Sequence, residues 1–153
     1  MTSMTSKLLL DSSILVEYVK QNRTDLLDIL AAPGRFDLFI NSTVLSEVTF
    51  HWIELYGAKA PRTLQQSKQV PAILRERSPL DFFGQFTVLP SDDRIVPIYL
   101  RLMQTYNLLP NDALILASAK LHQIPVVASY DPDFKSACAG EGMQLIREVA
   151  DVA

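Results

Sequence analysis

Short runs of consecutive apolar residues alternate along the chain with longer segments whose apolar residues recur every three or four positions. The runs are typical of strands buried in a parallel sheet, and the longer segments are typical of helices that cover it. This alternation predicts an α/β fold with a central parallel sheet of four to five strands between two layers of helices. The expected strands span residues 7–10, 36–40, 86–89 and 143–146, together with a run from Ile124 that ends in Asp131.

Polar residues suited to the N-cap position precede the expected helices. They are Ser12 or Ser13, then Thr24, then one of Asn41, Ser42 and Thr43, and finally Asn111 beside Pro110. The last of these helices has Ala113, Ala117 and Leu121 on one face, so we expect it to pack closely against the sheet.

Four acidic residues stand at the ends of these elements. Asp11 and Asp131 each end a strand, while Asp112 lies in the opening turn of one helix and Glu47 one turn into another. Each acid has an ordinary structural explanation, as a partner of the helix dipole, a turn residue or a solvated helix-face residue. The repetition of a strand that ends in Asp favours a shared site, because ligands of open parallel sheets bind outside the carboxyl ends of the strands.

Carboxylates that converge need a compensating charge, since two of them about 4 Å apart repel by about 4 kcal/mol at an effective dielectric constant of about 20. Raised pKa values would relieve part of this repulsion, and a divalent cation would relieve more. All-oxygen ligands favour Mg²⁺ or Mn²⁺ over Zn²⁺, and such a site supports phosphodiester hydrolysis. The predicted metal ligands and catalytic residues are Asp11, Glu47, Asp112 and Asp131, and the residues predicted to orient them are Ser13, Asp133 and Ser129.

Other catalytic patterns are not indicated. Neither His51 nor His122 has an acidic residue at a recognisable sequence spacing, which argues against a nucleophilic triad. Glycine-rich phosphate loops and dinucleotide fingerprints are absent from the sequence.

The composition is that of an ordinary globular protein. With 153 residues, 48% of them hydrophobic, we expect a single domain over residues 1–153 whose first six residues form a flexible tail. A net charge of −3 argues against a protein that coats nucleic acid by charge alone. The best candidate for a surface that meets phosphates is the basic stretch over residues 58–78, with Arg94, Arg101 and Lys120 as further candidates.

The cysteine content and the N-terminus bear on the compartment. The single cysteine, Cys138, cannot form an intrachain disulfide and makes no zinc pattern with the two histidines. The apolar run before Asp11 is too short for a signal segment or a membrane span. We therefore expect a cytoplasmic protein without membrane contact.

Four short motifs, taken in order, resemble those of the PIN-domain nucleases, and most closely those of the VapC-type toxins of toxin–antitoxin pairs. The motifs are Leu9-Leu10-Asp11-Ser12-Ser13, Ser46-Glu47-Val48, Asn111-Asp112-Ala113 and Ser129-Tyr130-Asp131-Pro132-Asp133-Phe134. The resemblance spans residues 7–147 and rests on order and spacing together. It implies a three-layer α/β/α PIN-like fold, RNA as the substrate, a toxin role, a small VapB-like antitoxin as the partner, and a homodimer.

The leading hypothesis is therefore a metal-dependent endoribonuclease, and two alternatives stay open. The first is a non-catalytic PIN-like module that binds RNA or a protein partner, although all four family acids are present. The second is a phosphotransfer domain of the receiver type, although it lacks the acidic pair expected beside the first strand end.

Overall fold

A computed structural model describes residues 5–152, and its centre is a parallel sheet of five strands in the order β3-β2-β1-β4-β5. The predicted α/β class and parallel sheet are confirmed. The strands are β1 (Ser6–Leu10), β2 (Phe36–Ile40), β3 (Thr87–Val88), β4 (Val126–Ala128) and β5 (Gln144–Ile146).

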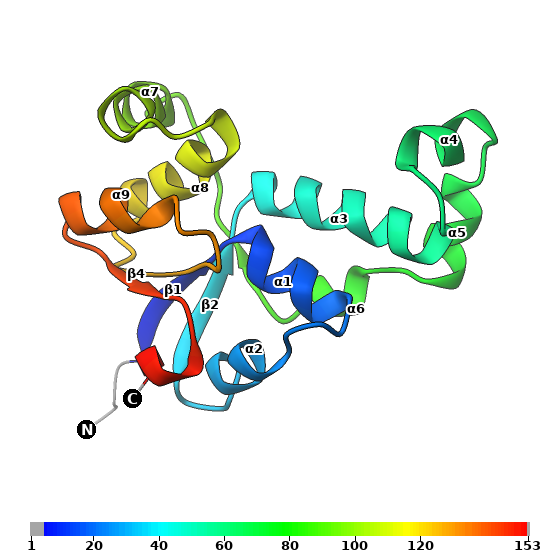
Figure 1. Ribbon diagram of the computed structural model, residues 1–153, viewed down its shortest axis with the longest axis horizontal. Coiled ribbons are helices and arrows are strands. Elements are labelled where there is room, and N and C mark those ends of the chain that lie inside the picture. Colours follow the sequence, from blue (N-terminus) through cyan, green and yellow to red (C-terminus); the bar gives the residue numbers. More distant parts are fainter. Residues whose placement is uncertain (1–4, 153) are drawn as a thin grey trace.

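Helices connect the strands and cover both faces of the sheet (Figure 1). In the sheet, β2 and β3 follow on one side of β1, and β4 and β5 follow on its other side. Right-handed crossovers therefore put the earlier and the later helices on opposite faces of the sheet. The helices are α1 (Ser12–Val19), α2 (Asp25–Leu30), α3 (Ser42–Gly57), α4 (Pro61–Gln66), α5 (Val70–Glu76), α6 (Leu80–Phe83), α7 (Ile95–Tyr106), α8 (Pro110–Leu121), α9 (Phe134–Gly140) and the 3₁₀ helix η1 (Val149–Val152).

The strand predictions are correct in place but differ at their ends. The second strand has the predicted bounds, whereas the first begins at Ser6, which pairs with Phe36 and so belongs to the sheet and not to the predicted tail. Residues 1–4 of that tail lie outside the described residues. The third, fourth and fifth strands are shorter than predicted.

Two of the predicted helix caps are wrong, for different reasons. Asp11 occupies the N-cap position of α1, and the hydroxyls of Ser12 and Ser13 bond to acidic side chains instead of capping the helix. Pro110 is the first residue of α8, which makes Leu109 the N-cap and leaves Asn111 inside the helix. Proline favours this first position because its fixed φ angle suits a helix and its missing N–H loses no bond there.

Asn41 is buried between the two helices that carry Glu47 and Asp112. Its side chain caps α3 by accepting a hydrogen bond from the Val44 N–H at 3.0 Å. The same amide group donates to the Ser118 hydroxyl of α8 at 2.8 Å and to the Leu114 carbonyl at 3.3 Å. One amide side chain therefore fixes the start of α3 relative to α8.

This role makes Asn41 a test of how the helices are held. Replacement by alanine removes a helix cap and leaves the Ser118 hydroxyl without its partner, so we expect Asn41→Ala to lower the free energy of unfolding by about 2 kcal/mol. Urea denaturation measures this change. The exposed Asn22→Ala is the matched control, and an equally small loss in both variants would contradict the bridging role.

Candidate functional site

The site lies where the strand order reverses. β1 and β4 are neighbours, with Leu10 opposite Ala128, and the Asp11 N–H donates to the Ala128 carbonyl at 2.9 Å. The chain leaves these two strands toward different faces of the sheet, which opens a crevice at their carboxyl ends. The structure therefore puts Asp11 at the topological switch point, with the end of β4 beside it.

Asp11 is the innermost of the predicted site residues, with 3% of its surface exposed. Its Oδ2 accepts hydrogen bonds from the hydroxyls of Ser13 at 2.7 Å and Ser129 at 2.6 Å. Burial raises the pKa of Asp11, while the bonds from these two serines act in the opposite direction. The serines therefore favour the ionised form of a carboxylate that water hardly reaches.

Glu47 points toward the same place from α3. It is half-buried, and its Oε1 accepts a hydrogen bond from the Ser12 hydroxyl at 3.0 Å. Ser12 also lies 3.5 Å from the Asp11 carboxylate, so it connects the two acids. Sequence reasoning missed this role because a serine after a strand is first of all a candidate helix cap.

Asp112, Asp131 and Asp133 form the tightest acidic group. Each offers a carboxylate oxygen, and these three atoms lie within 4.8 Å of one another. Asp112 and Asp131 are half-buried, and Asp133 is exposed. Asp133 was predicted only to orient other ligands, and the structure places one of its oxygens within 4.8 Å of oxygens of Asp112 and Asp131.

Asp131 does not end a strand directly, which corrects the sequence prediction. β4 stops at Ala128, and Asp131 follows three residues later in a loop. The hydroxyl of Ser129 causes this turn, because it accepts the Asp131 N–H at 3.0 Å. The Asp133 N–H in turn bonds to Asp131 Oδ1 at 2.9 Å, which fixes the carboxylate of Asp131.

The acids also influence one another electrostatically. The pKa of Asp112 is raised to about 7, first by burial and then by the negative charges of Asp11, Asp131, Glu47 and Asp133, in that order. Five carboxyl groups that are distant in sequence therefore act on one another through space. This is the charge crowding that the repulsion argument required.

The donor set suits a hard divalent cation. The clustered ligand atoms are carboxylate oxygens, which Mg²⁺ and Mn²⁺ prefer, and a cation there would relieve the repulsion that raises the pKa of Asp112. The histidines take no part among the described residues: the ring of His122 bonds to the Pro90 carbonyl, and His51 Nδ1 is buried without a hydrogen-bond partner.

The basic stretch predicted to meet phosphates lies far from the acidic site. Residues 58–78 form α4 and α5, which pack at the far end of α3 from Glu47 (Figure 1). At 1.5 Å per residue, the distance along α3 from Glu47 to Gly57 alone is about 15 Å. The further candidates are engaged elsewhere, since Arg94 pairs with Asp92, and both Arg101 and Lys120 pair with Glu141.

Within residues 5–152, no helix is both long and apolar enough to cross a membrane.

Comparisons with known proteins agree with this architecture. The model of the PIN domain family matches residues 8–140. Ribonuclease VapC2 of Methanocaldococcus jannaschii is 34% identical over 97 residues, which are 63% of this chain and 65% of that protein. The match thus spans slightly less than two thirds of the relative's length.

Two solved structures have the same fold. The structure of VapBC2 from Rickettsia felis, bound to a DNA fragment from their promoter, has a TM-score of 0.58 at 19% identity and covers 92% of this chain and 97% of that chain. VapBC-1 from nontypeable Haemophilus influenzae has a TM-score of 0.59 at 14% identity, with 92% and 96% covered. At these low sequence identities, the two structures show that the fold is shared and say nothing about function.

The raised pKa of Asp112 predicts an unusual pH dependence of stability in the absence of metal. Between the ordinary pKa of 3.8 and about 7, the folded protein keeps a proton that the unfolded chain has lost, so the free energy of unfolding falls as the pH rises. The side chain of Asp112→Asn does not titrate, so this part of the fall in the free energy of unfolding should be absent from the variant. We expect the variant to exceed the parent by about 1 kcal/mol at about pH 8 in EDTA, because solvent screening and the lost helix-dipole interaction both reduce the gain.

Urea denaturation at about pH 4 and about pH 8 measures this difference, which should vanish at the lower pH. The exposed Glu76→Gln on α5 is the control and should leave the pH dependence unchanged. If Asp112→Asn kept the parent's pH dependence, the crowding of acids around Asp112 would be refuted.

Proposed function

Because this chain belongs to the PIN domain family, we propose that it is a metal-dependent endoribonuclease and the toxin of a toxin–antitoxin pair. The observation that carries the proposal is the convergence of five carboxyl groups at the switch point of the sheet. Such a concentration of negative charge repels an RNA strand unless a cation is present. The reaction that fits is hydrolysis of a phosphodiester bond.

In this proposal Asp11, Glu47, Asp112 and Asp131 hold Mg²⁺ or Mn²⁺, with support from Asp133. When bound, such an ion supplies the positive charge that stabilises the developing negative charge at phosphorus and favours attack by water. The protein keeps the donors in place, since rigid orientation of ligands governs both metal affinity and activity.

Three serines orient the acids Asp11 and Glu47. Ser13 and Ser129 hold Asp11, and their hydroxyls lie 3.3 Å apart, so the two contacts support each other. Ser13 also accepts the Tyr130 N–H at 3.0 Å, which ties the start of α1 to the loop that carries Asp131. Ser12 holds Glu47 independently. These bonds orient carboxylates that would otherwise rotate away from one another.

The proposed substrate and protein partners are inferred from the names of similar proteins. The similar structures are named as VapBC complexes, and the similar curated protein is named a ribonuclease. We therefore propose RNA as the substrate, a small VapB-like antitoxin that restrains the enzyme, a homodimer, and a cytoplasmic location, where RNA is available.

Cleavage of RNA by the purified protein is the direct test. We expect cleavage in Mg²⁺ or Mn²⁺ and none in EDTA. Asp112→Asn should fold but cut at least about a hundredfold more slowly, because it removes one charge from the centre of the acidic group. The exposed Asp81→Asn on α6 is the matched control and should cut at the parent's rate.

Calorimetry with Mn²⁺ separates this proposal from a non-catalytic binding module. The parent should bind the ion, and Asp112→Asn should bind it at least about tenfold more weakly. A parent protein that takes up no Mn²⁺ at millimolar concentration and leaves RNA intact would favour the binding module.

The toxin role has its own test in cells. Expression of the chain alone should arrest growth, and co-expression of the adjacent open reading frame should restore it. Asp11→Ala should abolish the arrest at an equal protein level, because it removes the buried acid that both serines hold. Growth that is indifferent to all three conditions would point to a nuclease without a toxin role.

A further inference from the structure

A cavity lies near the end of β5, on the side of the loop that carries Asp131. It has a volume of about 880 Å³ and is lined by the segment before α2, the loop after β4, α9, β5 and the residues that follow β5. This volume falls in the range of about 300–1,000 Å³ that is usual for sites that enclose a small ligand. Tyr130 lines it and directly precedes Asp131, so the cavity adjoins that loop.

Arg147 brings a positive charge to the same edge of the sheet as the acids. β5 pairs with β4, with Ile146 opposite Ala128, so Arg147 leaves β5 at the same level as Ser129 leaves β4. Its Nη2 donates to the Tyr130 carbonyl at 3.2 Å. The guanidinium group is therefore anchored one residue before Asp131.

The Nε of Arg147 is the unexplained atom of this cavity. It is shielded from solvent and has no hydrogen-bond partner among the described residues. Buried donors are nearly always paired, and an unpaired donor on a charged group is particularly unfavourable. An anionic oxygen bound in the cavity would satisfy it once the Arg147 side chain turns toward the cavity.

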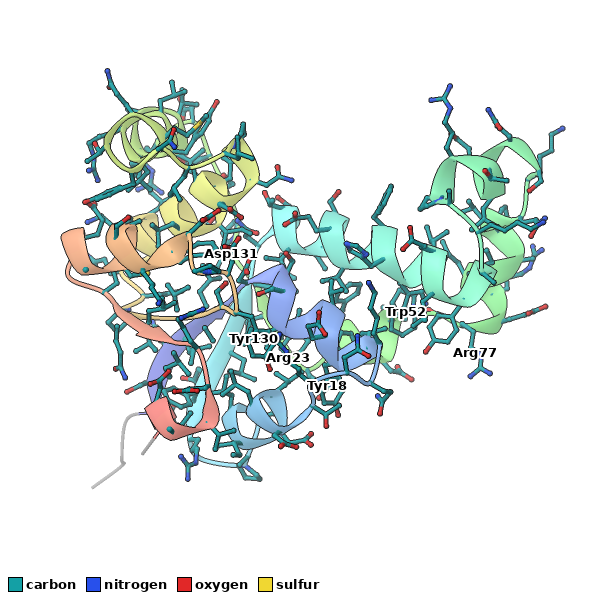
Figure 2. All side chains as sticks on the ribbon, in the orientation of Figure 1. Tyr18, Arg23, Trp52, Arg77, Tyr130 and Asp131 are labelled. Carbon is teal, nitrogen blue, oxygen red and sulfur yellow. The ribbon has the colours of Figure 1, made fainter. Side chains whose placement is uncertain are left out.

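Arg23 and Tyr130 form a second feature of the cavity wall. The Arg23 guanidinium carbon lies 4.7 Å from the centre of the Tyr130 ring, an arrangement typical of cation–π contacts. Figure 2 labels the two side chains close together, with Asp131 labelled above them. A cation stacked on an aromatic ring is a common surface for a nucleobase or the phosphate that follows it.

The acids that line the cavity do not neutralise these arginines. Asp25, Glu148 and Asp151 are all part of its wall, but none forms an ion pair with Arg23 or Arg147 within residues 5–152. Asp151 instead accepts the backbone N–H groups of Arg147 and Glu148, at 2.9 and 3.1 Å. Both guanidinium groups therefore remain available to an outside anion.

We propose that this cavity binds the nucleotide of the RNA strand next to the scissile phosphate. Its phosphate meets Arg147 Nε, and its base lies against the pair of Arg23 and Tyr130. The inference rests on the proposed function, and it assigns substrate binding to the side of the site near β5 instead of the basic stretch over residues 58–78.

The first experiment measures binding of a fluorescein-labelled, single-stranded RNA of mixed sequence to the full chain with Asp112→Asn, in Mg²⁺, so that a cation offsets the remaining acids while cleavage stays slow. Adding Arg147→Gln should weaken binding about tenfold, since a charge-assisted hydrogen bond is lost. The plot of log affinity against log salt should become shallower by about 0.7, as expected for one phosphate contact fewer on a single strand. Arg23→Gln should weaken binding about threefold.

Arg62→Gln is the matched control, because Arg62 is an exposed arginine on α4, at the far end of α3 from the acids and within the basic stretch over residues 58–78. It removes the same charge and should change neither affinity nor salt dependence. With Asp112 intact, Arg147→Gln should raise KM for cleavage about tenfold and leave kcat within about twofold.

The outcomes separate this inference from the proposed function. If the parent cleaves RNA but Arg147→Gln and Arg23→Gln keep its KM and salt dependence, the cavity is not a nucleotide site, although the nuclease stands. A parent that neither binds nor cleaves RNA overturns both proposals. Should thermal unfolding show that Arg147→Gln is not folded, the exposed Arg23→Gln decides alone.

Discussion

Repulsion among carboxylates at one edge of the sheet is the constraint on which the rest of the structure depends. Two ionised carboxylates about 4 Å apart repel by about 4 kcal/mol at an effective dielectric constant of about 20, a large fraction of the total stability of a typical domain. The pKa of Asp112 is raised to about 7 by burial first and then by the neighbouring negative charges. A fold that keeps such a group together must hold each acid by contacts that repulsion does not break.

The scaffold meets this constraint with backbone pairing and neutral donors. Asp11 is fixed by the pairing of β1 with β4 and by two serine hydroxyls, while Asn41 joins the helices that carry Glu47 and Asp112. None of these contacts uses a positive side chain. A lysine or arginine in their place would neutralise the acids permanently, whereas neutral donors orient them and leave their charge available to a cation.

The sequence was sufficient for the fold class, because the alternation of buried apolar runs with helical segments predicts a covered parallel sheet. It was also sufficient for the position of Asp11, which follows the first run directly at the carboxyl end of its strand. It was insufficient for contacts that depend on side-chain direction. The turn at Asp131 follows from the Ser129 hydroxyl, the bond from Ser12 to Glu47 joins residues 35 apart, and Asn41 bridges α3 to a residue 77 positions away. No local pattern marks such pairs, since serine and asparagine are equally common as caps.

The distribution of positive charge bears on how a chain of net charge −3 could act on the proposed polyanionic substrate. Arg94, Arg101 and Lys120 are bound to acids of the protein itself, so they contribute little field at a distance. Arg147 is held by a backbone carbonyl, a neutral partner that positions the guanidinium group without cancelling its charge. If the proposed cation binds among the carboxylates, positive charge at the acidic edge has two sources, that cation and Arg147 beside it, and each acts over only a few ångströms. Binding should therefore depend on how the strand fits the site more than on the overall charge of the protein.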